Sequence, residues 1–130
     1  MIHGTGIDLV DIRRIAAALE QQGERFVQRI LREEERAVMA GRGGFSDARA
    51  QRYLAGRFAA KEAFSKAWGT GIGAEVSFQD IAILNDERGA PVCHCFGVLA
   101  QRVKSQGLKA WVSLSDESDW VIAQVLLEKI

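Results

Sequence analysis

The sequence predicts an α+β protein in which a largely antiparallel sheet packs with one long central helix and several shorter helices. Residues 11–68 repeat their apolar side chains mostly at helical spacing, whereas the last quarter alternates apolar and polar side chains as strands do. Helices and strands are also segregated along the chain rather than strictly alternating, which favours antiparallel pairing. With 130 residues, the chain suits a single domain, residues 1–130, with one core.

The N-terminal third is expected to form a strand followed by three helices. The first ten residues combine apolar side chains with glycines, as a short strand does, and carry one acid, Asp8, near its end. From Asp11 to about Leu31 the apolar positions recur at helical spacing, and Gly23 predicts a break between two helices. A third helix is expected around Glu33 to Ala40.

The central segment is expected to be one long helix from about Ala48 to Trp68. Residues 41–47, GRGGFSD, form a flexible connection before it, and Ser46 or Asp47 is suited to cap its first turn. Gly69 is expected to stop the helix, because glycine readily adopts the left-handed conformation found after helices.

The last third is expected to contain two strand pairs and one helix. Residues 76–84, VSFQDIAIL, and the segment VCHCF have strand composition and are joined by turn residues 85–91. Residues 96–107 form a helix that ends on glycine. LKAWVSLS and WVIAQVLL then pair around SDESD as an antiparallel hairpin.

The composition indicates a folded protein without a general electrostatic partner. Hydrophobic residues make up 48%, and 17 Lys+Arg balance 17 Asp+Glu, so neither nucleic acid nor membrane is expected as a partner. No apolar run is long enough to span a bilayer and the N-terminus lacks signal-peptide features, which predicts a cytoplasmic protein. Cys93 and Cys95 do not predict a disulfide framework, and a metal clip with His94 is disfavoured because His94 would point to the opposite face of the strand.

The long helix carries two stripes of different character, since each residue turns by about 100°. The apolar stripe, expected in the core, consists of Ala60, Phe64, Ala67 and Trp68. The mixed stripe consists of Phe58, Glu62, Ser65, Lys66 and Gly69. By itself, a Glu62–Lys66 pair is most often a solvent-exposed ion pair without a function. This stripe, however, leads directly into the glycine-rich turn GTGIG.

The turn GTGIG, residues 69–73, suggests an anion site, because successive flexible residues can point several N–H groups toward one anion. The alternative is a simple helix cap followed by a loop. The turn follows a helix, so the helix dipole opposes an anion there. Lys61, Lys66 and Arg57 would have to outweigh it, or a divalent metal would.

Asp8 and Glu62 are candidate ligands for such a metal. Hard carboxylate oxygens suit Mg²⁺, which usually takes one or two protein carboxylates and fills its other positions with water and substrate phosphate. The alternative, that both are ordinary surface acids, stays open at this point.

Four segments together resemble the bacterial holo-acyl carrier protein synthases, a branch of the 4'-phosphopantetheinyl transferases. They are GTGIDLVDIRRI, LAGRFAAKEAFSKAWGTGIG, FQDIAILND and VSLS, which stand in the family's order along nearly the whole chain. The resemblance implies the 4'-phosphopantetheinyl transferase fold. It also implies an Mg²⁺-dependent enzyme of fatty acid biosynthesis that transfers the phosphopantetheine arm of coenzyme A to a serine of apo-acyl carrier protein, releasing 3',5'-adenosine bisphosphate.

The resemblance also implies roles for individual residues. Asp8 and Glu62 would hold the Mg²⁺, while coenzyme A is the substrate. Lys66 would neutralise phosphate charge, with Lys61 as a weaker candidate. The family's Gly-Thr-Gly phosphate contacts fall on Gly69, Thr70 and Gly71. Glu35, in LREEER, would position a metal-bound water or relay the serine proton, although three successive glutamates more often form a solvated face.

Members of the resembled family are homotrimers with active sites between subunits, and Phe58 would pack at the edge of such a site. They receive the acidic acyl carrier protein on the basic first helices. The residues that match this surface are Arg14, Arg25, Phe26 and Arg29. Arginine suits carboxylate recognition because its planar group donates two parallel hydrogen bonds.

Three positions depart from the family pattern. Trp111 and Asp116 stand where histidines are common, and Ala90 stands where a lysine is usual. These losses predict an altered affinity for coenzyme A, or arginines elsewhere that contact its 3'-phosphate. They also support an alternative function, a non-catalytic module that binds coenzyme A or a carrier protein, but such a module has no evident need for both Asp8 and Glu62.

Overall fold

A computed structural model describes residues Met1–Ile130, the whole chain. The elements, in chain order, are β1 (Ile2–Asp11), α1 (Ile12–Gln22), α2 (Glu24–Ile30), α3 (Glu33–Ala40), α4 (Ala48–Trp68), the short 3-10 helix η1 (Phe78–Asp80), β2 (Ile81–Asn85), β3 (Pro91–Cys95), α5 (Gly97–Ser105), β4 (Leu108–Glu117) and β5 (Trp120–Lys129). The predicted α+β class is confirmed, because the helices and strands occupy separate stretches and every strand pair is antiparallel.

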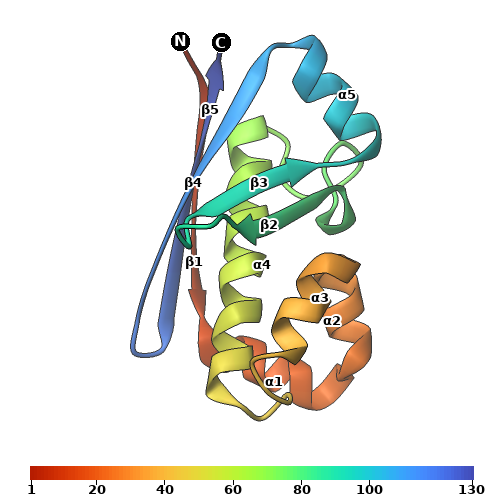
Figure 1. Ribbon diagram of the computed structural model, residues 1–130, viewed down its shortest axis with the longest axis vertical. Coiled ribbons are helices and arrows are strands. Elements are labelled where there is room, and N and C mark those ends of the chain that lie inside the picture. Colours follow the sequence, from red (N-terminus) through yellow and green to blue (C-terminus); the bar gives the residue numbers. More distant parts are fainter.

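The strands form two sheets on opposite sides of α4 (Figure 1). The larger sheet has the order β1-β5-β4, which brings the first strand of the chain next to the last, and the smaller sheet pairs β2 with β3. Helices α1, α2 and α3 gather at one end of α4, and α5 lies near its other end (Figure 1). The two chain termini lie side by side, where Lys129 N donates a hydrogen bond to Met1 O at 2.7 Å.

The central helix α4 has the predicted bounds, and both ends have the expected chemistry. The Asp47 side chain accepts a hydrogen bond from Arg49 N, and Gly69 ends the helix with a left-handed φ of 109°. Because both sheets pack against α4, residues outside the predicted apolar stripe are buried as well. On the mixed stripe Ser65 is buried and Phe58 and Glu62 are half-buried, whereas Trp68 on the apolar stripe is only half-buried.

Strand β1 lies directly against α4, and two glycines permit this approach. A Cβ atom at Gly4 would meet the carbonyl oxygen of Ala67, and one at Gly6 would meet the carbonyl oxygen of Ala63. Alternate residues of a strand face the same side, so Asp8 continues this series toward α4. The glycines near the N-terminus therefore place the carboxylate of Asp8 next to the long helix.

Two predicted boundaries are wrong. The strand expected over residues 76–84 starts only at Ile81, because residues 78–80 form η1, in which Ser77 N donates to Asp80 Oδ2 at 2.9 Å. In the last hairpin, the strands extend through most of SDESD and leave Ser118, with a φ of 53°, and Asp119 at the turn.

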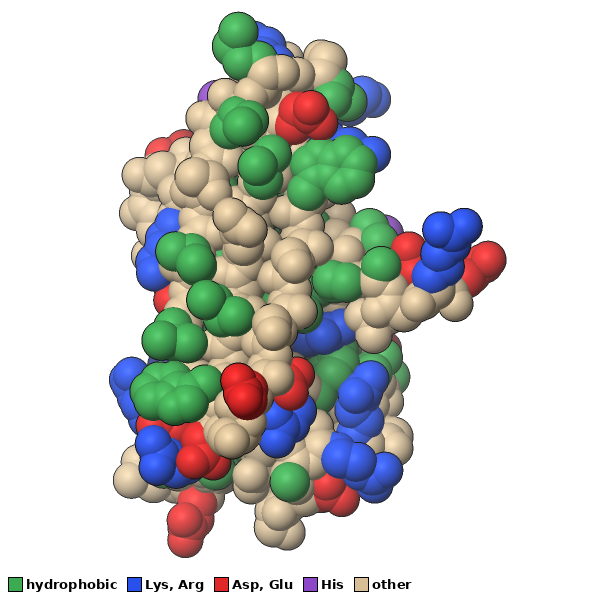
Figure 2. All heavy atoms as spheres, turned by 90° about the vertical axis from the view of Figure 1, so that its left-hand side faces the viewer, with side chains coloured by type: hydrophobic (Ala, Val, Ile, Leu, Met, Phe, Trp, Pro, Cys, Tyr) green, Lys and Arg blue, Asp and Glu red, His purple; other side chains and the backbone are tan.

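The face of the large sheet that points away from α4 has no other element packed on it (Figures 1 and 2). Apolar side chains are spread over this face in Figure 2. Large exposed apolar side chains on β1, β4 and β5 include Ile2, Ile7, Leu9, Trp111, Trp120 and Ile122. Separately, none of the helices is both long and apolar enough to cross a lipid bilayer.

Candidate active site

Asp8 of β1 and Glu62 of α4 line the same cavity, although they are far apart in the sequence. The cavity has a volume of about 370 Å³. Its other lining residues are Leu9, Val10, Arg14, Ile15, Ala18, Phe26 and Phe58. Two carboxylates and one arginine are thus set into a mainly apolar wall, where charges are screened less than in open water.

The carboxylate of Glu62 is in an unfavourable place for a negative charge. Burial and, second, the charge of Asp8 raise the pKa of Glu62, and the charge of Lys66 only partly opposes this. The Glu62 carboxylate takes part in no ion pair, whereas Asp8 Oδ1 accepts a hydrogen bond from Lys66 Nζ at 3.0 Å. A cation between the two carboxylates would relieve this repulsion.

The donor set is compatible with Mg²⁺. No group of three or more His, Cys, Asp or Glu side chains is arranged to hold a metal, so zinc-like coordination by protein ligands alone is not available. Mg²⁺ commonly uses only one or two carboxylates and completes its shell with water and phosphate oxygens. Asp8 and Glu62, facing a cavity with room for such oxygens, fit this requirement.

Lys66 places a positive charge beside the carboxylate pair. Its Nζ is shared between Asp8 Oδ1 and Ile7 O, each at 3.0 Å, and its side chain remains 50% exposed. The residue lies in the last turn of α4, where a cation offsets the negative end of the helix dipole. Lys66 is therefore accessible to a phosphate group that approaches Asp8 and Glu62.

The glycine-rich turn is organised differently from the predicted anion site. The N–H groups of Gly69 and Gly71 both donate to Ser65 O at 3.1 Å, so they close the helix and are not free for an anion. The hydrogen bonding of these two amides therefore does not support the predicted phosphate contacts of Gly69 and Gly71. Thr70 N has no backbone partner, and its hydroxyl donates to Gly71 O at 2.9 Å, so Thr70 stays a candidate.

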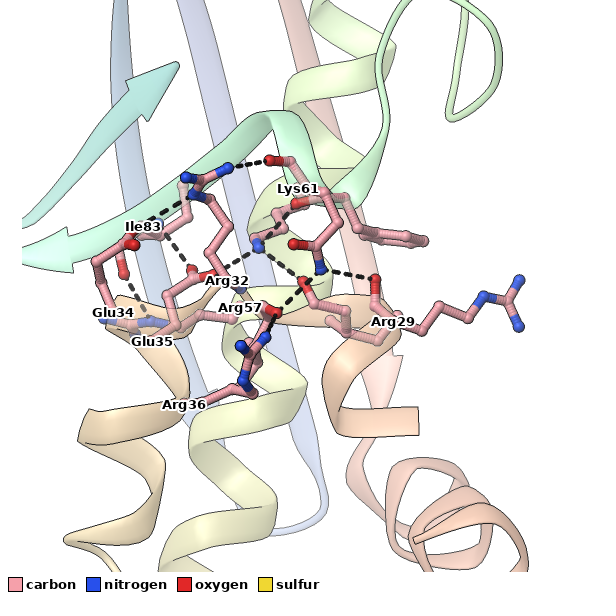
Figure 3. A network of polar contacts seen from close by, with 12 residues as sticks. Arg29, Arg32, Glu34, Glu35, Arg36, Arg57, Lys61 and Ile83 are labelled. Atoms are coloured by element: carbon pink, nitrogen blue, oxygen red, sulfur yellow. Dashed lines mark hydrogen bonds and ion pairs between the residues drawn. The ribbon is translucent and has the colours of Figure 1, made fainter. Parts of the chain in front are cut away.

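The structure does not support the predicted roles of Lys61 and Glu35, because both side chains are completely buried and neither lines the cavity. Figure 3 shows them within a network of polar contacts. Lys61 Nζ pairs with Glu35 Oε1 at 2.6 Å, and the other Glu35 oxygen accepts from Ile83 N at 2.8 Å. Burial lowers the pKa of Lys61, and the charge of Glu35 opposes that shift. Neither residue can reach a phosphate or relay a proton in the cavity; together they form an internal ion pair.

The predicted partner surface divides into exposed arginines and enclosed aromatics. Arg14, Arg25 and Arg29 are exposed and form no intramolecular ion pair. Phe26, in contrast, is only 8% exposed and lines the cavity, so its predicted contact with the partner would have to be made there. Phe58 is half-buried, lines the same cavity, and stacks on Phe78 with ring centroids 5.5 Å apart.

A second cavity, of about 180 Å³, was not predicted from the sequence. Four arginines line it: Arg42, Arg49, Arg52 and Arg57. Arg52 donates to Asp116 Oδ1 at 2.8 Å, and the neighbouring Tyr53 hydroxyl is buried without a hydrogen-bond partner. The spacing of Arg49 and Arg52 on one face of α4 was an available signal, but Arg42 comes from the preceding loop and no local pattern links it to them.

The three residues that depart from the resembled family's pattern lie in different settings. Asp116 lines the arginine cavity, whereas Trp111 lies on the outer sheet face, where its Nε1 donates to Glu128 Oε1 at 3.0 Å. Ala90 lies in the exposed turn between β2 and β3, where its N–H donates to Asp86 Oδ1 at 2.9 Å.

Comparisons with known proteins show the family to which the chain belongs. The sequence model of the 4'-phosphopantetheinyl transferase superfamily matches residues 4–125. A holo-acyl-carrier-protein synthase of Bacillus velezensis is 47% identical over 130 residues, covering 100% of this chain and 98% of the relative. Two crystal structures of such synthases share the fold. The one from Neisseria meningitidis has a TM-score of 0.90 and 42% identity, and the match covers 99% of this chain and 100% of that one. The one from Bacillus anthracis, in complex with CoA (3',5'-ADP), has a TM-score of 0.83 and 42% identity, and the match covers 100% of this chain and 99% of that one. The chain therefore belongs to the 4'-phosphopantetheinyl transferase superfamily.

Proposed function

We propose that this protein transfers the 4'-phosphopantetheine group of coenzyme A to a serine of apo-acyl carrier protein, giving holo-acyl carrier protein and 3',5'-adenosine bisphosphate for fatty acid biosynthesis. The observation that carries the proposal is the pair Asp8 and Glu62, set together in one cavity beside Lys66. Its support from comparison is that relatives of the same length are holo-acyl-carrier-protein synthases, and that solved ones bind coenzyme A.

The reaction is a phosphoryl transfer in which positioning and charge neutralisation supply most of the catalysis. The serine oxygen forms a bond to the phosphorus that bears pantetheine, and the bond from that phosphorus to the departing 3',5'-adenosine bisphosphate breaks. Asp8 and Glu62 would hold Mg²⁺, which supplies positive charge to the pyrophosphate when bound. Lys66 adds a second positive charge at the same place, and the apolar cavity wall keeps these charges effective by limiting solvent screening.

The exposed arginines support recognition of the carrier protein. Arg14 lies at the cavity itself, and Arg25 and Arg29 project from α2 without intramolecular partners. An acidic carrier would pair with these groups and deliver its serine to Asp8 and Glu62. Such pairing speeds encounter and fixes orientation more than it adds affinity, so carrier binding should weaken at high salt.

The arginine cavity is a candidate site for the 3'-phosphate of coenzyme A. Asp116, which stands where the family commonly has histidine, pairs there with Arg52, and the other arginines of the cavity, Arg42, Arg49 and Arg57, add positive charge beside that pair. Replacing Arg52 with alanine is expected to raise KM for coenzyme A about tenfold, the typical loss of a charged hydrogen bond. The same change should leave KM for 3'-dephospho-coenzyme A unaltered; an equal rise for both would exclude this assignment.

A homotrimer with active sites between subunits is the proposed assembly, and the outer sheet face supports it. Apolar side chains on this face, including Leu9, Ile122 and Trp120, are exposed on a surface that no helix covers. Several large apolar side chains exposed on one uncovered face exceed the isolated exposed residues that are usual on a monomer, which supports an interface there. Light scattering should give three chains per particle, and Ile122→Asp should yield inactive monomers. The free thiols Cys93 and Cys95 accord with the proposed cytoplasmic location.

The direct test is an assay with purified protein, coenzyme A, Mg²⁺ and apo-acyl carrier protein. Mass spectrometry should show a carrier heavier by the phosphopantetheine mass. Coenzyme A binding without transfer to any cognate carrier, and without dependence on Mg²⁺, would instead favour the non-catalytic binding module.

A further inference from the structure

Helix α2 depends on contacts from other elements to keep its place. It has seven residues, too few for a helix to be stable on its own. It carries Arg25 and Arg29, the exposed arginines that the proposed function assigns to the carrier protein. At the C-terminal end of any helix, the last carbonyl groups lack N–H partners within the helix and need partners from elsewhere.

Gln79 of η1 supplies several of these partners at once. Its side-chain nitrogen lies 2.7 Å from Gln28 O, 3.3 Å from Arg29 O and 2.9 Å from Leu31 O. Two N–H groups serve three carbonyl oxygens, with the contact to Arg29 O the longest. One side chain from a segment about fifty positions away thus caps the end of α2.

Two cations complete the cap, and both suit the negative end of a helix dipole. Lys61 Nζ donates to Ile30 O at 2.7 Å, and Arg36 Nη1 donates to Leu31 O at 2.8 Å. In Figure 3 the dashed contacts from Lys61 and Arg36 converge on this end of α2, whereas the Arg29 side chain points away from them. The carbonyl oxygens from residue 28 to residue 31 therefore all have side-chain donors.

Gln79 is itself held in place. Arg32 Nη1 donates to Gln79 O at 2.6 Å, and the Arg32 guanidinium lies 3.6 Å from the centroid of the Phe96 ring. Lys61 also donates to Phe78 O at 3.0 Å, which fixes η1 against α4 one residue from Glu62. This set of contacts links the helix that carries Arg25 and Arg29 to the helix that carries the metal ligand.

We infer that Gln79 is a positioning residue for carrier recognition, acting through α2; the inference rests on the proposed function. Without the Gln79 amide, the end of α2 loses its shared donor, and a smaller fraction of molecules presents Arg25 and Arg29 in the competent position. Apparent affinity for the carrier falls by that fraction. Asp8, Glu62 and Lys66 lie outside α2, so coenzyme A binding and the transfer step are unaffected.

The test compares Gln79→Met with Gln101→Met. Methionine keeps the side-chain length and removes the donors without adding charge, and Gln79 is exposed, so the variant is expected to fold. Gln101 is an exposed glutamine of α5 outside these contacts and is the matched control. Gln79→Met should raise KM for apo-carrier about three- to tenfold, the effect of losing one or two hydrogen bonds, with kcat and KM for coenzyme A unchanged.

Amide hydrogen exchange gives a second readout that does not need activity. In Gln79→Met, exchange should become faster in residues 24–31 and stay unchanged in α4. If the wild type is active and Gln79→Met leaves KM for the carrier unchanged, the inference is wrong while the proposed function stands. The inference is also wrong if Gln79→Met lowers kcat and alters both KM values, because that result indicates a merely structural role. If the wild type is inactive with every cognate carrier, the proposed function fails, and the exchange pattern then decides whether Gln79 holds α2.

Discussion

Replacing Lys61 with methionine is expected to lower the free energy of unfolding by about 3–5 kcal/mol, the usual cost of breaking a buried ion pair from one side. The ammonium lies 2.6 Å from Glu35 Oε1, 2.7 Å from Ile30 O and 3.0 Å from Phe78 O, and the side chain is 0% exposed. Methionine fills similar space but leaves Glu35 buried with only two backbone donors, Arg32 N at 2.9 Å and Ile83 N at 2.8 Å. This loss is a large share of the stability of an ordinary domain, about 5–15 kcal/mol.

Urea unfolding followed by circular dichroism measures the change, at one fixed protein concentration because assembly affects apparent stability. Lys104→Met, an exposed change on α5, is the control. A loss below about 1 kcal/mol, which is typical of surface pairs, would show that Lys61 and Glu35 do not form a stabilising buried pair.

Further predictions concern the site. Gly6→Ala puts a Cβ against the backbone oxygen of Ala63, so β1 must move away from α4. The free energy of unfolding should then fall by about 1–3 kcal/mol. Half-maximal activity in a magnesium titration should also require a higher Mg²⁺ concentration. Without metal, the pKa of Glu62 is raised, so the folded protein binds this proton more tightly than the unfolded chain does. The protonated carboxyl therefore contributes stability below the ordinary glutamate pKa. This contribution is lost as the pH rises through the raised pKa. Urea unfolding in EDTA should show this pH dependence, and Glu62→Gln should abolish it. A twofold or smaller effect of raised salt on carrier KM would contradict the role of Arg14, Arg25 and Arg29.

The fold was predictable where local stereochemistry sets an element's limits. The break at Gly23, the cap at Asp47 and the end at Gly69 each follow from one residue's conformational preference, and all three are present. The start of β2 was not predictable in this way. Val76 and Phe78 are as buried as strand residues, so their composition cannot distinguish a strand from a packed loop and 3-10 turn.

The site was predictable only in part. The carboxylate pair Asp8 and Glu62 was inferred from ligand chemistry and a family resemblance, and the structure brings both residues to one cavity. Lys61 is next to Glu62 in sequence, but one helical step turns it by about 100° into the layer of α2 and α3. Its partner Glu35 looked like one of three solvated glutamates, because a contact across 26 positions leaves no local pattern.

The proposed function requires that Asp8 and Glu62 hold the Mg²⁺ that activates transfer from coenzyme A to the carrier protein. The most direct measurement is the rate of holo-carrier formation by wild type and Glu62→Gln as Mg²⁺ is titrated after removal of metal with EDTA. Turnover is expected to require Mg²⁺ in the wild type. Glu62→Gln is expected to lose at least about a hundredfold in rate, on the order of the 3–4 kcal/mol that a major electrostatic group contributes, with the fold intact by circular dichroism. Full activity of Glu62→Gln, or wild-type turnover that does not depend on Mg²⁺, would contradict it.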